Sequence, residues 1–218
     1  MSRSSAAANK MKPTPSASKS GKRIRKDADT RRAEIIKTGY ELLAADGYAA
    51  FSLREVAARC QIRLATVQHH FKDRATLLEA LVDFAVADIV TTFNRFSSMA
   101  HATPAERLRH FMMQLLTQNN NRNTAGFFVE FWAMAHRDPA AARSLERSQA
   151  HGIHIISALI SAARPDIPPR RASELGTVLM AAADGLMLSV GYGKKPSAAL
   201  GKDPLPGLVD RLMELALL

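Results

Sequence analysis

Two adjacent histidines, His69 and His70, are the side chains of this sequence that most suggest chemistry. Imidazoles can ligate a metal ion or transfer protons near neutral pH. Consecutive residues of a helix point about 100° apart, however, whereas metal ligands on one helix are spaced by three or four residues. The pair is therefore not a metal site. It lies in the polar stretch Leu64–Arg74, whose side chains suit a surface that contacts another molecule.

Other candidates for metal or catalytic chemistry are weaker. His151 and His154 have ligand spacing, but no carboxylate follows in a metal-site pattern and their neighbours are apolar, so packing or pocket lining is favoured. The single cysteine, Cys60, excludes a disulfide framework within the chain, and a buried structural thiol is favoured over a sensor. No nucleophile elbow or phosphate-binding glycine loop is present. We expect no metal, no cofactor and no enzyme activity.

Length and composition indicate a helical protein with a substantial core. The chain has 218 residues, of which 47% are hydrophobic, and the abundant Ala and Leu favour helices. No apolar run reaches the length of a membrane span, and the N-terminus lacks the hydrophobic segment of a secretory signal. We therefore expect a soluble, cytoplasmic protein without a membrane partner.

The net charge of +10 is concentrated at the N-terminus. Residues 1–26 contain eight Lys or Arg residues and no acidic or aromatic residue, so they are predicted to form a disordered basic tail. Such a tail attracts nucleic-acid phosphates in a salt-dependent way. A solubilising leader or a mis-assigned start codon explains the same composition, so the tail's role stays open.

Helical spacing of apolar residues predicts an all-α fold of about nine helices. Ser52 and Thr103 begin capping-box patterns, Asp73 and Asp138 are further caps, and Gly47 suits a left-handed C-cap. The Gly- and Pro-rich residues 191–206 predict a loop. The predicted helices cover residues 30–46, 52–60, 64–70, 74–97, 104–118, 125–136, 139–163, 172–192 and 208–218.

The two short helices 52–60 and 64–70, joined by a short turn, have the form of a helix-turn-helix. The second helix of such a motif can enter the major groove of DNA. Residues that must pack inside are apolar: Val56, Ala57, Ile62, Val67 and Phe71. The side chains left facing outward are Arg63, Leu64, Ala65, Thr66, Gln68, His69 and His70.

Residues 30–78 resemble the N-terminal domain of the tetracycline-repressor (TetR) family. The matching residues are Thr30-Arg31, Tyr40–Tyr48, Ser52–Ala58, Ile62, Thr66-Val67, His69–Phe71 and Asp73–Leu78. The resemblance implies a helix-turn-helix DNA-binding domain of three helices in residues 27–75. It also implies a helical domain in residues 76–218 that binds an effector and dimerises. Met180–Leu188 resembles the dimerisation helix of BetI-like, choline-responsive members.

At five positions the chain departs from the pattern of the family. Where this chain has Gln61, Arg63, Ala65, Gln68 and Arg74, the family usually has Gly, Ser, Gly, Tyr and Lys, respectively. A left-handed turn at Gln61 would cost roughly 1 kcal/mol, so we expect a slightly different turn. Arg63 cannot cap the recognition helix, but it can reach a phosphate or a guanine edge.

The predicted DNA contacts fall into two classes by side-chain type. Phosphate contacts are expected from Ser52, Thr66, Lys72 and Arg74. Base contacts are expected from Arg63, Gln68 and His69, because Arg pairs with guanine and Gln with adenine. Arg54 suits either class, and Leu64, Ala65 and His70 complete the surface.

The second part of the chain is rich in Phe, Met and His. This composition suits an apolar effector pocket with a few polar anchors, but ordinary core packing is favoured for each residue taken singly, and the pocket itself is implied by the family resemblance. The candidate pocket residues are Phe93, Phe111, Phe127, Phe131, Trp132, His154 and Asp184, with Asn120 as a further polar anchor.

These features predict a DNA-binding transcriptional regulator, specifically a ligand-responsive repressor. We expect a homodimer, formed through helices 172–192 and 208–218, on a near-palindromic double-stranded DNA operator. An unidentified small-molecule effector would shift helix 74–97 and so change the spacing of the recognition helices. The alternative is a helical small-molecule-binding or interaction protein with a vestigial DNA-binding domain, suggested by the missing Gly, Ser and Tyr.

Overall fold

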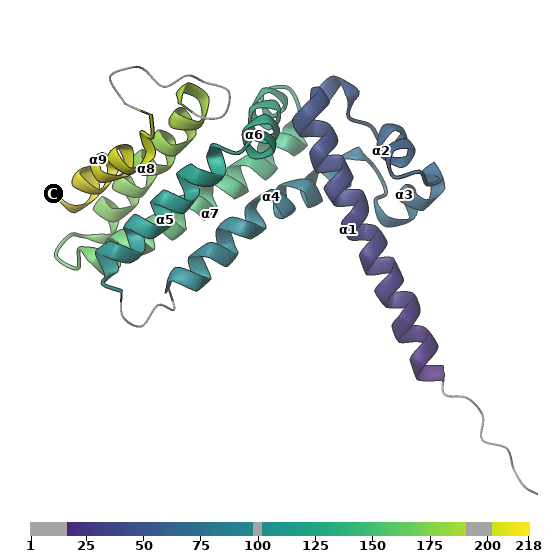
Figure 1. Ribbon diagram of the computed structural model, residues 1–218, viewed down its shortest axis with the longest axis horizontal. Helices are drawn as coiled ribbons and strands as arrows, with labels where there is room; N and C mark the ends of the chain where they lie inside the picture. The colour runs from purple at the N-terminus through teal and green to yellow at the C-terminus, as the bar shows by residue number, and fades with distance from the viewer. Residues whose placement is uncertain (1–16, 98–101, 191–201) are drawn as a thin grey trace, which may run out of the picture. The chain divides into compact units, whose positions relative to one another are not determined.

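The computed structural model describes the backbone of residues 17–97, 102–190 and 202–218, and their side chains except 17–26, 88–90 and 92–97. Within these ranges the chain is all-helical, as predicted, and contains no strand (Figure 1). The helices are α1 (Ala17–Ala50), α2 (Leu53–Arg59), α3 (Leu64–His70), α4 (Arg74–Ser97), α5 (Pro104–Asn119), α6 (Arg122–Ala135), α7 (Pro139–Ala163), α8 (Pro169–Ser189) and α9 (Leu205–Leu217).

The chain divides into two units, residues 1–33 and 34–218. In the first unit the described residues form the beginning of α1, which starts at Ala17 rather than at the predicted Thr30. Residues 17–26 are thus helical where the sequence suggested disorder. Five of these ten residues are Lys or Arg, which are good helix formers, and no proline lies between Pro15 and Pro104. Residues 1–16 of the predicted tail lie outside the described residues.

Capping side chains begin several helices at the predicted positions. The Ser52 hydroxyl accepts a hydrogen bond from the Glu55 N–H at 3.1 Å, and Asp138 accepts one from the Ala140 N–H at 2.8 Å. Thr103 and Glu106 form a complete capping box. The capping box expected at Ser52 is only half formed. Ser52 accepts the Glu55 N–H, but the Glu55 carboxylate accepts a hydrogen bond from Arg59 at 3.1 Å.

Besides α1, three helices begin earlier than predicted. Helix α6 starts at Arg122 because the Asn121 side chain accepts hydrogen bonds from the N–H groups of Asn123 and Thr124. Helices α8 and α9 carry Pro169 and Pro206 in their first turns, where the missing N–H group costs nothing. Asn121, Pro169 and Pro206, which were predicted to lie in loops, therefore mark the starts of helices. Most of the predicted loop 191–206 lies outside the described residues.

Two hydrophobic clusters form the core of residues 34–218. The first joins buried side chains of α1–α4 with Phe127, Phe131 and Met134 of α6. The second is built from α5, α7, α8 and α9. Helix α7 lies between them and packs against α4, α5, α6 and α8 (Figure 1). By its buried side chains, α6 belongs to the cluster that supports α2 and α3. Among the described residues, no helix combines the length and apolarity that crossing a membrane requires.

Candidate DNA-binding surface and ligand cavity

Helices α2 and α3 form the predicted helix-turn-helix. Val56 and Ala57 of α2 and Val67 of α3 are buried, and Phe71, directly after α3, is completely buried. The backbone N–H of Phe71 donates to the carbonyl of Val67 at 2.8 Å, which closes the last turn of α3. These contacts fix the orientation of α3, so its remaining side chains face away from the core.

The turn between α2 and α3 keeps the left-handed conformation. Gln61 has φ = 55°, and it is the one residue other than glycine with positive φ among those described. Its N–H donates to the Ala58 carbonyl at 3.0 Å, and the Ile62 N–H donates to the Ala57 carbonyl at 3.0 Å. We expected an altered turn because Gln replaces the usual glycine. The turn is instead retained, at the steric cost of placing a Cβ in this region.

The surface predicted to contact DNA is largely presented to solvent. Seven of its members are exposed: Ser52, Arg54, Arg63, Ala65, Gln68, His69 and Lys72. Leu64, Thr66 and His70 are half-buried, and Leu64 packs against the first core cluster. Arg63 occupies the N-cap position of α3 without a capping hydrogen bond from its side chain. Its guanidinium thus extends from the start of the candidate recognition helix.

Arg74, predicted to contact phosphate, also contacts Tyr48 within the protein. Its Nη2 donates a hydrogen bond to the Tyr48 carbonyl at 3.2 Å, and its Cζ lies 3.8 Å from the centroid of the Tyr48 ring. The side chain is half-buried because the first turn of α4 lies against the end of α1. Asp73 caps α4 as predicted, accepting the Thr76 N–H at 2.8 Å, and this hydrogen bond lowers the pKa of Asp73.

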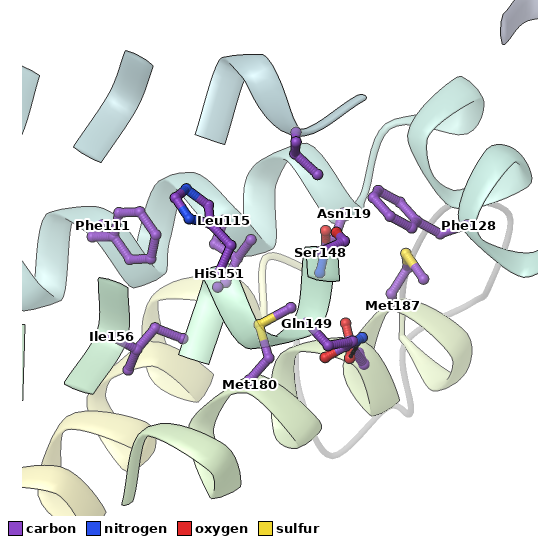
Figure 2. A pocket seen from close by; sticks show the side chains of 13 residues that line it. Phe111, Leu115, Asn119, Phe128, Ser148, Gln149, His151, Ile156, Met180 and Met187 are labelled. Carbon is purple, nitrogen blue, oxygen red and sulfur yellow. Dashed lines mark hydrogen bonds between the residues drawn. The ribbon is translucent and has the colours of Figure 1, made fainter. Parts of the chain in front are cut away.

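A cavity of about 30 Å³ opens between α4, α5, α6, α7 and α8 (Figure 2). By this measure it has room for the centres of two or three water molecules. Figure 2 shows Phe111 and Phe128 at opposite sides of the cavity, with Met180 between them. The lining residues are Val86, Phe111, Leu115, Asn119, Phe128, Ser148, Gln149, His151, Gly152, Ile156, Met180, Asp184 and Met187.

Asp184 is the one carboxylate among the described lining residues, and none of those residues is Lys or Arg. Gln149 donates a hydrogen bond from Nε2 to its Oδ2 at 2.8 Å. Burial raises the pKa of Asp184 to about 6, because the apolar surroundings disfavour the charged form, while the hydrogen bond from Gln149 opposes the shift. The cavity therefore combines an apolar wall with one costly negative charge.

The predicted pocket residues divide between this cavity and other places. Phe111 and Asp184 line it. Phe127 and Phe131 do not, because they are completely buried in the first core cluster. Trp132 and the exposed His154 lie outside the lining set. The side chain of Phe93 is outside the described residues.

Several lining residues were missed because they come from helices far apart in sequence. Phe128, Gln149 and Met180 belong to α6, α7 and α8. The polar anchor on α5 is Asn119, one position before the predicted Asn120, and its amide donates to the Ala183 carbonyl at 3.2 Å. A detectable signal was the adjacent polar pair Ser148-Gln149 on α7, whose buried face also carries Ser144 and Ser157. Among the described residues, no group of three His, Cys, Asp or Glu side chains could hold a metal ion.

Two family models match this chain. One, described as bacterial regulatory proteins of the tetR family, matches residues 35–81. The other, described as the C-terminal part of BetI-type transcriptional repressors, matches residues 104–213, which is half of the chain. This chain belongs to the TetR family. TetR-family proteins are DNA-binding transcriptional regulators and not enzymes, so the predicted class of function is confirmed.

Individual relatives agree with a TetR repressor of BetI type. The HTH-type transcriptional regulator BetI of Burkholderia mallei (strain NCTC 10229) is 27% identical over 169 residues, covering 77% of this chain and 85% of that protein. A transcriptional regulator from Rhodococcus sp. Rha1 has a similar structure, with a TM-score of 0.67 and 22% identity over 85% of this chain and 95% of that one. A regulator from Saccharomonospora viridis, solved in complex with choline, has a TM-score of 0.60 and 20% identity over 85% of this chain and 95% of that one.

Proposed function

We propose that this TetR-family protein is a ligand-responsive repressor that binds a near-palindromic operator as a homodimer. The observation that carries the proposal is a helix-turn-helix packed on the core, with an exposed polar surface. Arg63, Gln68 and His69 project from α3, which the buried Phe71 fixes to the core. A polar helix held in this way can enter the major groove and read base edges.

Arg63 provides the sharpest test of base reading. We expect Arg63→Ala to reduce discrimination between the best site and a one-base-pair variant by about tenfold, the value of one good bidentate contact. The measurement is fluorescence anisotropy with a fragment of the protein's own promoter region and the variant fragment, at two salt concentrations. Lys72→Ala is the matched control, and it should weaken both fragments equally and reduce the salt slope.

If Arg63→Ala weakens binding to both fragments equally, Arg63 contacts phosphate and does not read a base. If the wild-type protein shows no sequence preference at moderate salt on any promoter fragment, the repressor proposal fails. A vestigial DNA-binding domain would then explain the loss of the family's usual Gly, Ser and Tyr at Gln61, Arg63 and Gln68.

The homodimer is proposed to form through α8 and α9. Of the six large hydrophobic residues exposed in the described chain, three lie on these helices, Val178, Leu188 and Leu215, and a fourth, Leu218, directly follows α9. On α8, Val178, Ala181, Gly185 and Leu188 are all exposed at spacings that place them on one helix face. A continuous small and apolar stripe of this kind permits close helix packing.

Light scattering coupled to size-exclusion chromatography tests the dimer. The double variant Val178→Glu/Leu188→Glu should elute as a monomer, because two charges would be buried against an apolar partner surface. Ala58→Glu, which changes an exposed apolar residue of α2, is the control and should stay dimeric. A dimer of unchanged stability in the double variant would exclude this interface.

The effector is proposed to be a small organic cation that binds beside Asp184. Because the cavity has room for only two or three water molecules, the lining helices must move apart to admit it. A cation would neutralise the desolvated carboxylate and could contact the faces of Phe111 and Phe128. Choline is the first probe, since a relative with this fold was solved with it. Isothermal titration should show binding that Asp184→Asn weakens at least tenfold, whereas Asp83→Asn at an exposed site should leave it unchanged.

A further inference from the structure

Helix α1 is interrupted near its end by a kink at Gly47, and this turn, which leads into the DNA-binding motif, lies against Glu130 of α6. Gly47 in this turn has φ = 77° and ψ = 178°, a conformation open almost only to glycine. A Cβ on Gly47 would lie 3.0 Å from Oε2 of Glu130 and 3.2 Å from Oε1. The carboxylate thus fills the space that a side chain at position 47 would need.

Tyr48, the next residue, is held on both sides of its backbone by charged side chains. Its N–H donates to Oε2 of Glu130 at 2.9 Å, and its carbonyl accepts from Nη2 of Arg74 at 3.2 Å. The same guanidinium lies over the Tyr48 ring. Hydrogen bonds to charged groups are roughly twice as strong as neutral ones. Two opposite charges from α6 and α4 therefore fix one residue of the turn, four positions before the Ser52 cap of α2.

Helix α6 itself is seated tightly on α1. A Cβ on Gly126 would lie 2.4 Å from the carbonyl oxygen of Ala44, so the two backbones are in direct contact. The Phe127 ring stacks on Tyr40 with centroids 4.7 Å apart. One turn further along α6, Glu130 is thereby aimed at the Tyr48 N–H. The intervening Phe128 lines the cavity, so one short helix contacts both regions.

We propose that Glu130 is a positioning residue for DNA binding. By accepting the Tyr48 N–H, it holds the turn between α1 and α2 in the conformation that sets α2 and α3 in place. It acts through the protein backbone and lies outside the DNA-contacting surface. This role of Glu130 requires only that the protein binds DNA, and it does not depend on the proposed effector.

The test compares Glu130→Ala, Glu130→Gln and Glu146→Ala. Glu146 lies exposed on α7, so its variant controls for the loss of one negative charge. The readouts are the Kd for the promoter fragment without effector and the hydrogen-exchange rate of the Tyr48 amide. We expect Glu130→Ala to weaken specific DNA binding by about tenfold and to speed Tyr48 exchange by a similar factor.

Glu130→Gln keeps a carbonyl oxygen that can accept the same hydrogen bond, so it should restore DNA affinity to within about threefold of the wild type. If Glu130→Ala matches Glu146→Ala in both readouts, the proposal is wrong. Equal loss in Glu130→Gln and Glu130→Ala with Tyr48 still protected also overturns it, because charge alone would then explain the effect.

Should Glu130→Ala melt at a much lower temperature, Glu130→Asp replaces it. The shorter carboxylate keeps the charge but withdraws from Tyr48, so it must also lower DNA affinity, and unchanged affinity rejects the proposal. A second readout, the change in DNA affinity when choline is added, rests on the effector function proposed above. Since the first readout uses no effector, failure of one proposal is distinguishable from failure of the other.

Discussion

The helix-turn-helix and the cavity arrange their polar groups in opposite directions. Around α3 the apolar side chains are buried and the polar ones, such as Gln68 and His69, face solvent. Around the cavity, Asp184 and Gln149 face inward among Phe and Met side chains. The first arrangement costs little free energy, and it leaves polar groups available for a hydrated partner. The second carries the desolvation of a carboxylate, which only a suitable ligand or a proton relieves.

Helix α6 belongs to both arrangements. Its Phe127 and Phe131 complete the core under the DNA-binding helices, whereas Phe128, between them, lines the cavity. A domain boundary drawn along the sequence at residue 75 therefore does not coincide with the packing. The difference between the two regions can be tested by substitutions that affect one of them and leave the other intact.

The largest expected effect is on the core of the DNA-binding region. Phe71→Ala should lower the free energy of unfolding by about 3–5 kcal/mol, because Phe71 is completely buried and its removal leaves a cavity. Urea denaturation followed by circular dichroism measures the change. Phe84→Ala is the matched control, since Phe84 is 44% exposed, and it should cost less than about 1.5 kcal/mol. Similar losses in the two variants would contradict the assigned packing.

The next effect concerns the cavity and depends on pH. The pKa of Asp184 in the folded protein, about 6, lies above its ordinary value of 3.8, so the folded state binds the proton more tightly. The associated stability is present below about pH 4 and is lost as the pH rises through 6. At pH 7.5, Asp184→Asn should therefore be more stable than the wild type by about 2 kcal/mol, allowing for partial exposure of the group.

Urea denaturation of both proteins at pH 4.5, 6 and 7.5 provides the check on Asp184. The stability difference should grow with pH, and Asp83→Asn should show no such trend. A difference that stays constant across the three pH values would mean that Asp184 is not desolvated as the structure indicates. Choline binding should also weaken by about tenfold between pH 7 and pH 5, because the carboxylate is then mostly protonated.

The smallest effect concerns the turn between α2 and α3. Gln61→Gly should raise the free energy of unfolding by about 0.5–1 kcal/mol, since glycine adopts φ = 55° without a Cβ clash but loses more entropy on folding. Thermal melting measures this gain, and Gln68→Gly in the middle of α3 should instead destabilise. If Gln61→Gly destabilises, the left-handed conformation at this position is not strained.

The sequence predicted the helix-turn-helix well because its determinants are local. Ser52 caps α2, Phe71 anchors α3, and each lies within a few residues of the helix it controls. The bounds of α3, α4 and α7 follow from the same kind of signal. Gln61 is the exception, because the family pattern could not reveal that a residue with a Cβ would keep the turn.

The cavity was predicted only in part because long-range packing determines it. Phe111 and Asp184 were identified, yet their neighbours come from helices separated by dozens of residues. Phe127 and Phe128 are adjacent in sequence and equally aromatic, but one is core and the other lines the cavity. The contact of Arg74 with Tyr48 was not predicted for the same reason, because Tyr48 lies on another helix.

Trp132 gives the molecule an intrinsic optical reporter. It is the single tryptophan of the chain and lies half-buried on α6, two positions after Glu130. Indole emission shifts in wavelength when its surroundings change polarity, so α6 can be followed without any attached dye. Titrating choline and promoter DNA in the same cuvette would show, from the order of the spectral changes, whether α6 responds to one ligand, to the other, or to both.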